Sequence, residues 1–283
     1  FIEFIFIIFL LLIFKILGLK VSLFISSFIF RIIGPLFRTK KISYNNLSTV
    51  LPNISKTEKN KIIDMMWENY GKIFSEYMFI KNFRTDPKFS KKIVVENQEE
   101  LERIKLENKP VIFISGHFAN YELMSMELTK ANIKLATIYR PLNNMFLNPY
   151  MEYLRKTYVC KNQIKKGLNG VKESLEYIKK GYSVALMVDQ RVSEGPRISF
   201  FNGEAHTTTL PAQLSSRFGC DIVPIYISRD KNDIFEMEIL DPINILESEK
   251  KNKELITKKI NQTIEKLILR DPGQWILTHN RWK

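Results

Sequence analysis

Short apolar runs alternate with amphipathic stretches along most of this chain of 283 residues, and this alternation constrains the fold more than any other feature. Strands are expected at residues 111–114, 134–139, 183–188, 222–228 and 235–240. Helices are expected at residues 58–80, 120–129, 143–156, 170–180, 210–218 and 250–269, and a loop rich in turn residues at 191–206. Strands alternating with helices predict an α/β fold with a mixed, largely parallel sheet flanked by helices.

The chain begins with an apolar stretch that predicts a membrane anchor. Residues 1–19 contain Glu3 and Lys15, and they barely reach the roughly 20 apolar residues that span a bilayer as a helix. Residues 21–37 contain Arg31 and are typical of an interfacial helix or of half a helical hairpin. A cleaved signal peptide is disfavoured, because a basic leading region and a small-residue cleavage pattern are absent. We therefore expect an anchor at residues 1–41 and a catalytic domain at 42–283.

The charge of the chain indicates anionic partners. Lys and Arg number 43 against 30 Asp and Glu, which gives a formal net charge of +13. Acidic phospholipid, phosphorylated lipid, an acidic carrier protein or nucleic acid would all be attracted. We expect no nucleic-acid partner, because no nucleic-acid-binding module accompanies the charge. Basic residues follow the first apolar segment and predict that the rest of the chain lies in the cytoplasm: Lys15, Lys20, Arg31, Arg38, Lys40 and Lys41.

His117 and Glu122 follow the first expected strand of the catalytic domain in the pattern H-x-x-x-x-E. Residues five apart on one regular helix point roughly 140° away from each other. The two side chains can therefore pair only if His117 precedes the helix and Glu122 lies in its first turn. A carboxylate bound to one imidazole nitrogen raises the basicity of the other. The pattern thus predicts a general base for an alcohol, although a lone histidine with a structural role remains the alternative.

The sequence predicts neither a metal site nor a cofactor. The other two histidines, His206 and His279, are far apart, and Cys160 and Cys220 lack C-x-x-C spacing. Two cysteines also form no disulfide framework, which fits a reducing compartment.

Polar residues follow three of the expected strands. His117, Arg140 and Asp189 come directly or closely after the strands that begin at residues 111, 134 and 183. Ligands of open α/β sheets bind outside the carboxyl ends of the strands. These three side chains are therefore expected to form one site. The alternative is a structural ion pair between Arg140 and Asp189.

The chain resembles the late acyltransferases of lipid A biosynthesis, the lauroyl/myristoyl transferase family within the wider lysophospholipid and glycerolipid acyltransferase group. The resemblance covers residues 46–283. It rests on Asn46-Leu47 with Pro52, Gly116-His117-Phe118 with Glu122, Tyr139-Arg140-Pro141, Asn148-Pro149, Arg155, Lys180-Gly181, Asp189-Gln190, Phe200-Phe201 and the closing stretch from Gln274 to Lys283. Glu rather than Asp at position 122 favours the lipid A branch over the glycerol-phosphate acyltransferases.

The resemblance implies acyl transfer from an acyl carrier protein thioester to a hydroxyl of a lipid A precursor, at the inner (cytoplasmic) membrane with the catalytic domain on the cytoplasmic face. His117 would deprotonate the hydroxyl, with Glu122 as its dyad partner and with no covalent acyl-enzyme. Arg155 and Asp189 match functional residues of the family, and Arg140 joins them as substrate-binding or transition-state support. Oxyanion stabilisation, phosphate binding and a structural salt bridge all remain open for Arg155.

Exposed cations are expected to meet the acidic partners. Candidate contacts to phosphates of the acceptor are Lys165, Lys166, Arg191, Arg197 and Arg281. Candidate contacts to the carrier protein are Lys161, Lys165, Lys166, Lys179 and Lys180.

The chain departs from the family pattern in three places. Leu277 replaces a common Trp, Gln190 replaces a frequent His, and residues 202–204 replace a Gly-x-Pro. Another glycolipid or a phospholipid is therefore the alternative acceptor. A non-catalytic, membrane-anchored basic binding protein of the same fold is the alternative function.

Overall fold

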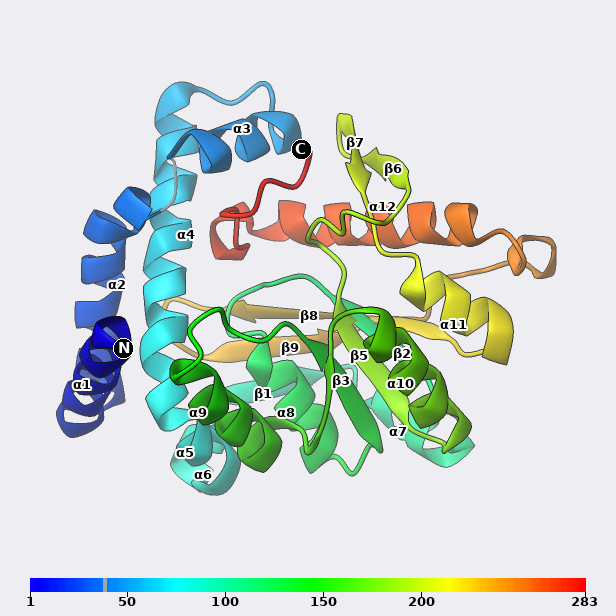
Figure 1. Ribbon diagram of the computed structural model, residues 1–283, viewed down its shortest axis with the longest axis horizontal. Helices are drawn as coiled ribbons and strands as arrows, with labels where there is room; N and C mark the ends of the chain where they lie inside the picture. Colours follow the sequence, from blue (N-terminus) through cyan, green and yellow to red (C-terminus); the bar gives the residue numbers. More distant parts are fainter. Residues whose placement is uncertain (38–39) are drawn as a thin grey trace.

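The computed structural model describes residues 1–37 and 40–283 and has an α/β architecture (Figure 1). Its main sheet has seven strands, in the order β1 (Ile93–Glu96), β9 (Phe235–Ile239), β8 (Ile222–Arg229), β2 (Ile112–Ser115), β5 (Ser183–Met187), β3 (Leu135–Tyr139) and β4 (Asn162–Lys165). Neighbouring strands run parallel, except that β8 and β9 run antiparallel. The expected mixed, largely parallel sheet is therefore confirmed.

Helices surround this sheet. The α-helices are α1 (Ile2–Leu17), α2 (Leu19–Phe37), α3 (Lys40–Val50), α4 (Lys56–Glu76), α5 (Ile80–Thr85), α6 (Pro87–Ser90), α7 (Gln98–Glu107), α8 (Glu122–Lys130), α9 (Leu147–Leu154), α10 (Leu168–Lys179), α11 (Leu210–Phe218) and α12 (Lys253–Arg270). Short helical turns are η1 (Tyr77–Phe79), η2 (Arg155–Val159), η3 (Glu247–Glu249) and η4 (Pro272–Gln274).

The connections between strands reverse direction at the centre of the sheet. The units β2–α8–β3 and β3–α9–β4 progress toward the β4 edge, whereas β4–α10–β5 and β5–α11–β8 progress the other way. Because such crossovers are right-handed, α8 and α9 cover one face and α10 and α11 the other. The neighbouring strands β2 and β5 are thus followed by helices on opposite faces. A ligand crevice is expected where their carboxyl ends meet.

Three expectations about elements were wrong. β1 and β4 were missed, because they are four-residue edge strands, each with a single buried position. A hairpin, β6 (Arg197–Phe200) with β7 (Gly203–His206), occupies part of the expected loop 191–206. The helix expected at 143–156 begins later, because the Asn144 side chain accepts hydrogen bonds from the amides of Phe146 and Leu147 and caps the chain there.

α4 supports both the sheet and the N-terminal helices. A capping box between Ser55 and Glu58 starts this helix, whose buried side includes Ile63 and Met66. Figure 1 shows α1 and α2 outside α4 at one end of the molecule. At Gly71 a Cβ atom would come within 2.4 Å of a carbonyl oxygen of α2, so this glycine allows the two helices to pack closely.

The N-terminal helices agree in part with the expected anchor. Residues Leu19–Leu36 of α2 are long and apolar enough to cross a membrane, with a mean hydropathy of 1.6. Arg38, one of the basic residues used to predict orientation, lies outside the described residues.

Candidate active site

His117 and Asp189 meet at the crevice between β2 and β5. His117 lies two residues beyond β2 and Asp189 two residues beyond β5. The His117 Nδ1 atom lies 2.7 Å from Asp189 Oδ1, and the His117 backbone N–H donates to Asp189 Oδ2 at 3.1 Å. The other ring nitrogen, Nε2, lies 3.4 Å from the Gln190 side-chain amide. Nδ1 is therefore committed to a carboxylate, and Nε2 is the nitrogen left to accept a proton.

Asp189 is buried and bound from two sides. The indole N–H of Trp275 donates to Oδ2 at 2.8 Å, so this oxygen has two donors in addition to the ring contact at Oδ1. Burial by itself would raise the pKa of Asp189. The charge of His117 and the hydrogen bonds from His117 and Trp275 outweigh burial and lower that pKa to about 2. Asp189 is consequently an ionised carboxylate that fixes the imidazole.

The loop that carries His117 is held by the C-terminal tail. The amide of Ala119 donates to the carbonyl of Gln274, and the amide of Ile276 donates to the carbonyl of His117. These bonds form a short antiparallel bridge between Phe118 and Trp275. The tail is held in turn by Asn46 of α3, whose side-chain amide donates to the carbonyl of Leu277 at 2.8 Å. Two sequence motifs more than 220 residues apart thus support the same loop.

Glycine is required at position 116 because the loop is crowded. A Cβ atom there would lie 2.8 Å from the Phe118 ring and 3.4 Å from the Asp189 Cβ. Any other residue would therefore have to displace the buried Phe118 ring. The backbone also takes a positive φ of 38° at Ala119.

Glu122 has different partners from the one expected. Its Oε1 accepts hydrogen bonds from Arg155 Nε at 2.8 Å and Nη2 at 2.6 Å, and from the Tyr77 hydroxyl at 2.8 Å. The direct contact with His117 that the spacing predicted does not form. The chain turns sharply at Ala119 before α8 begins, so Glu122 points toward η1 and η2 while His117 points toward β5.

Arg155 is correspondingly committed to Glu122. Burial would lower the pKa of Arg155, but the Glu122 carboxylate raises it above its usual range. Both side chains are buried, so their ion pair joins the start of α8 to the end of α9. Arg140 lies on the surface, and Asp189 binds His117, so the alternative of a structural ion pair between Arg140 and Asp189 is not what the structure has.

A second buried ion pair was not predicted from the sequence. Glu76 is bound by both terminal nitrogens of Arg229, at 2.5 and 2.9 Å, and it accepts a hydrogen bond from Asn120 at 2.9 Å. This cluster ties α4 and β8 to the residues that follow His117. The only signal in the sequence is an acidic residue within the apolar stripe of residues 58–80. Trp275 lies in the closing stretch that carries the family resemblance, but its hydrogen bond to Asp189 could be seen only once the fold was known.

The basic residues predicted to bind the acceptor's phosphates differ in burial. Lys166 follows β4, near Arg140, and desolvation of its ammonium group lowers its pKa, as does the charge of Arg140. Lys165 is exposed and 3.5 Å from Glu152, and Arg197 is exposed on the hairpin beside Glu204. Arg281 is only 1% exposed. It donates to the His206 carbonyl and the Thr207 hydroxyl, so the structure places it inside the protein.

Arg191 is the remaining candidate and is half-buried beside Gln190. Arg140 and Lys166 directly follow the carboxyl ends of β3 and β4, and Arg191 lies four residues beyond the end of β5. No group of three or more histidine, cysteine, aspartate or glutamate side chains forms a metal site among residues 1–37 and 40–283.

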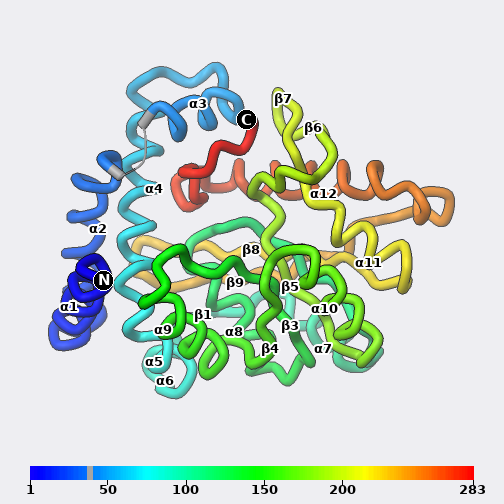
Figure 2. The backbone as a smooth tube through the Cα atoms, viewed as in Figure 1, coloured from blue at the N-terminus to red at the C-terminus, as the bar shows by residue number. Residues whose placement is uncertain are grey.

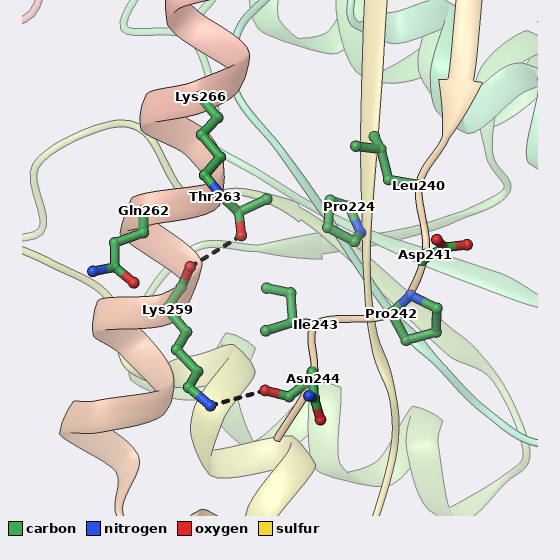
Figure 3. Close-up of a pocket in the computed structure, with 10 residues that line it drawn as sticks. All are labelled: Pro224, Leu240, Asp241, Pro242, Ile243, Asn244, Lys259, Gln262, Thr263 and Lys266. Carbon is green, nitrogen blue, oxygen red and sulfur yellow. Dashed lines mark hydrogen bonds between the residues drawn. The ribbon is translucent and has the colours of Figure 1, made fainter. Parts of the chain in front are cut away.

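A hollow of about 350 Å³ lies away from this crevice (Figure 3). It is lined by the segment after β9, by Pro224 and by one side of α12, and none of the candidate site residues reaches it. Lys259 closes one side of it by donating to the Asn244 carbonyl at 2.9 Å.

Comparisons with known proteins identify the family of the chain. A family model described as bacterial lipid A biosynthesis acyltransferase matches residues 1–283. The chain is 26% identical to lipid A biosynthesis acyltransferase 2 of Shigella flexneri, over 82% of this chain and 73% of that protein. It is 26% identical to the lipid A biosynthesis palmitoleoyltransferase and 24% identical to the lauroyltransferase of Escherichia coli (strain K12), each over 87% of this chain and 79% of the relative.

Proposed function

Because the chain belongs to the bacterial lipid A biosynthesis acyltransferase family and is therefore an acyltransferase, we propose that it moves a fatty acyl chain from an acyl carrier protein thioester to a hydroxyl of a lipid A precursor. The proposed place of reaction is the cytoplasmic face of the inner membrane. The apolar helices α1 and α2 and the net charge of +13 support a membrane surface.

The observation that carries this proposal is the contact of 2.7 Å between His117 Nδ1 and Asp189 Oδ1. Asp189 holds the imidazole with its proton on Nδ1, so Nε2 accepts the proton of the acceptor hydroxyl. The acceptor oxygen then attacks the thioester carbonyl carbon. The new ester C–O bond forms, the C–S bond breaks, and the carrier thiolate leaves and takes the proton back from His117.

Glu122 acts in this scheme by holding the structure around the base. Its ion pair with Arg155 fixes the first turn of α8 against η2, and the Tyr77 hydroxyl binds the same carboxylate oxygen. The ring of Tyr121 lies edge-on to the His117 ring, 4.8 Å between centroids, and so links this cluster to the base. The dyad expected from the sequence is thus replaced, in this proposal, by His117 with Asp189.

The acceptor's phosphates are assigned to cations at the same end of the sheet. Arg140, Lys166 and Arg191 are placed there by β3, β4 and β5. A guanidinium group binds phosphate through two parallel hydrogen bonds, and an ammonium group adds a point charge. Lys165 and Arg197 are more remote candidates, and buried Arg281 is assigned to holding the tail in place.

The test is an acyl-transfer assay with the full chain, an acyl carrier protein thioester and a tetra-acylated lipid A precursor, read out by mass spectrometry of the lipid. His117→Ala is expected to lower turnover about 10²–10⁴-fold, the usual value of a general base. His206→Gln is the matched control, because the His206 ring binds the Gly195 carbonyl and not Asp189. Wild-type turnover in a folded His117→Ala protein would overturn the assignment.

A further inference from the structure

α1 and α2 turn apolar side chains outward instead of toward the core. The exposed apolar residues of α1 are Ile2, Ile5, Phe6, Phe9, Leu12, Ile16 and Leu17. Those of α2 are Val21, Phe24, Phe28, Ile32 and Leu36. Most are spaced three or four apart, so they form one stripe along each helix. A helix on the surface of a water-soluble domain directs such a stripe to the core.

The opposite sides of these helices are fixed to the protein. Phe14 of α1 is buried and packs edge-on against Phe74 of α4, with ring centroids 6.4 Å apart. In α2 the Ser26 hydroxyl donates to that of Ser75 at 3.0 Å, and Arg31 binds Glu68 at 3.0 Å. α2 therefore lies side by side with α4 over much of its length, as Figure 2 also shows.

This packing determines the orientation of α2 relative to a bilayer. α4 carries Asp64 and Glu68 beside α2, where they lie 3.8 and 3.0 Å from Arg31 of that helix. If α2 crossed the bilayer in this packing, it would take these charges into hydrocarbon, which is strongly unfavourable. A helix that lies in the plane of the interface buries its apolar stripe and leaves the neighbouring charges in water.

The loop between β3 and α9 continues the same apolar surface. The Phe146 ring packs edge-on against that of Phe1, with centroids 5.4 Å apart, and the Asn144 side chain donates to Glu3 at 2.9 Å. Leu142 and Met145 of this loop are exposed, Met145 by 75%. The loop leaves the carboxyl end of β3, which is the end of the sheet where His117 and Asp189 lie.

We propose that the outward stripes of α1 and α2 and the loop at residues 141–146 form one lipid-facing surface, so that the enzyme lies flat on the bilayer with this loop inserted beside the site entrance. The proposal rests on the membrane location proposed above. The exposed cations Lys20 and Arg140 border this surface and suit the anionic headgroups of a bilayer better than a second positively charged copy of the chain. A lipid acceptor would then reach the crevice without leaving the membrane surface.

The first test places an environment-sensitive dye in the loop through Met145→Cys. The native cysteines, Cys160 and Cys220, are both buried, so the added thiol reacts selectively. The same dye at Phe24→Cys reports α2, and at Leu106→Cys it reports an exposed apolar position on α7, away from α1 in Figure 1. The vesicles contain equal parts of phosphatidylcholine and phosphatidylglycerol, with or without a quencher on the acyl chains.

Dyes at positions 145 and 24 are expected to brighten on vesicles and to be quenched from within the bilayer, while the dye at 106 does not respond. A response at 24 without one at 145 would overturn the role of the loop. A dye at 145 that brightens with protein concentration alone would assign the surface to a second copy. No response at either position would overturn the lipid-facing surface itself.

The second test separates this surface from catalysis. Leu142→Glu with Met145→Glu is expected to weaken partition onto these vesicles by roughly ten-fold or more, because two apolar side chains lose their burial in lipid. Leu106→Glu is the matched control and should leave partition unchanged. Turnover of detergent-dispersed acceptor should survive in both proteins. Unchanged partition of the double variant onto vesicles would contradict the lipid-facing surface. If the wild-type protein itself fails to acylate detergent-dispersed acceptor, the proposed acyl transfer is contradicted instead.

Discussion

Two buried carboxylates near His117, those of Glu122 and Asp189, have different roles. Asp189 binds the imidazole at 2.7 Å, whereas Glu122 binds Arg155 and Tyr77. Asp189→Asn would keep the shape of the site but lose the charge that orients the ring, so kcat is expected to fall by about 10²–10⁴-fold. Circular dichroism should show a folded protein, and steady-state kinetics gives kcat.

Glu122→Gln is expected to act mainly on stability. It leaves the buried Arg155 guanidinium without its counter-charge, a change that typically costs about 3–5 kcal/mol. The melting temperature should therefore fall by several degrees, and the folded fraction should keep most of its kcat. A melting temperature equal to wild type, combined with a kcat as low as that of Asp189→Asn, would move Glu122 into the chemistry.

The ionisation of Asp189 predicts a particular acid sensitivity. Its pKa is about 2 in the folded protein and about 3.9 in an unfolded chain. A lowered folded-state pKa stabilises the protein above pH 4, and this contribution of about 2–3 kcal/mol is lost as the pH falls from about 4 to 2. Unfolding free energies of the wild type and Asp189→Asn should consequently converge over this window. Parallel curves between pH 5 and 2 would show that the carboxylate is not held in this way.

At the scale of elements, the C-terminal tail supplies Asp189 with a hydrogen-bond donor, the indole N–H of Trp275. Trp275→Phe keeps an aromatic ring in the same buried place but removes the N–H that binds Asp189 Oδ2 at 2.8 Å. We expect kcat to fall roughly ten-fold, since a hydrogen bond to a charged group contributes about 1.5–3 kcal/mol. The loss of a donor should also raise the pKa of Asp189 and move its acid-sensitive window upward.

Trp282→Phe is the matched control for this change. Trp282 lies in the same tail, and its N–H donates to the carbonyl of Phe200 at 3.0 Å, away from Asp189. It should leave both kcat and the acid window unchanged. Equal effects of the two substitutions would mean that the tail acts through general stability.

The elements also show what could be predicted from sequence. The five central strands have buried apolar runs or, in β9, alternating buried apolar residues, so they could be predicted from periodicity. The rule for parallel sheets then predicted a candidate site at their carboxyl ends. The partner of His117 was not found. It depends on the strand order, which makes β2 and β5 neighbours across about seventy residues, and on a positive φ at Ala119 that turns Glu122 away. Neither the pairing of distant strands nor a local turn at an alanine leaves a periodic signal.

At the scale of the whole molecule, the apolar N-terminal helices and the basic residues lie in different places around the crevice. The N-terminal helices stand at one end of the molecule. Lys165 ends the edge strand β4 and Lys166 follows it, at the end of the sheet where His117 and Asp189 lie. Lys179 and Lys180 end α10, which returns to the start of β5, and Lys161 precedes β4. Of the five lysines predicted to receive the carrier protein, three therefore lie toward the opposite end of the strands.

This division makes the carrier prediction specific. Docking of an acidic carrier near the site should depend on Lys165 and Lys166, which are both exposed. Charge reversal of this pair to Glu is expected to raise KM for the carrier-bound donor roughly ten-fold with little change in kcat, because the lysines would contribute binding and not transition-state contacts. Reversal of Lys179 and Lys180 changes the net charge equally and is the matched control, expected to have a much smaller effect.

Salt dependence then identifies the partner of these lysines. The Debye length shrinks from about 10 Å at 0.1 M to about 3 Å at 1 M salt, so docking through exposed charges weakens. Turnover at saturating acceptor should fall more steeply with salt for the carrier-bound donor than for a coenzyme A thioester of the same chain, and the reversal of Lys165 and Lys166 should remove that difference. If both donors show the same salt slope and the reversal instead raises KM for the lipid, the two lysines bind the acceptor's phosphates, and the carrier does not dock at this end of the sheet.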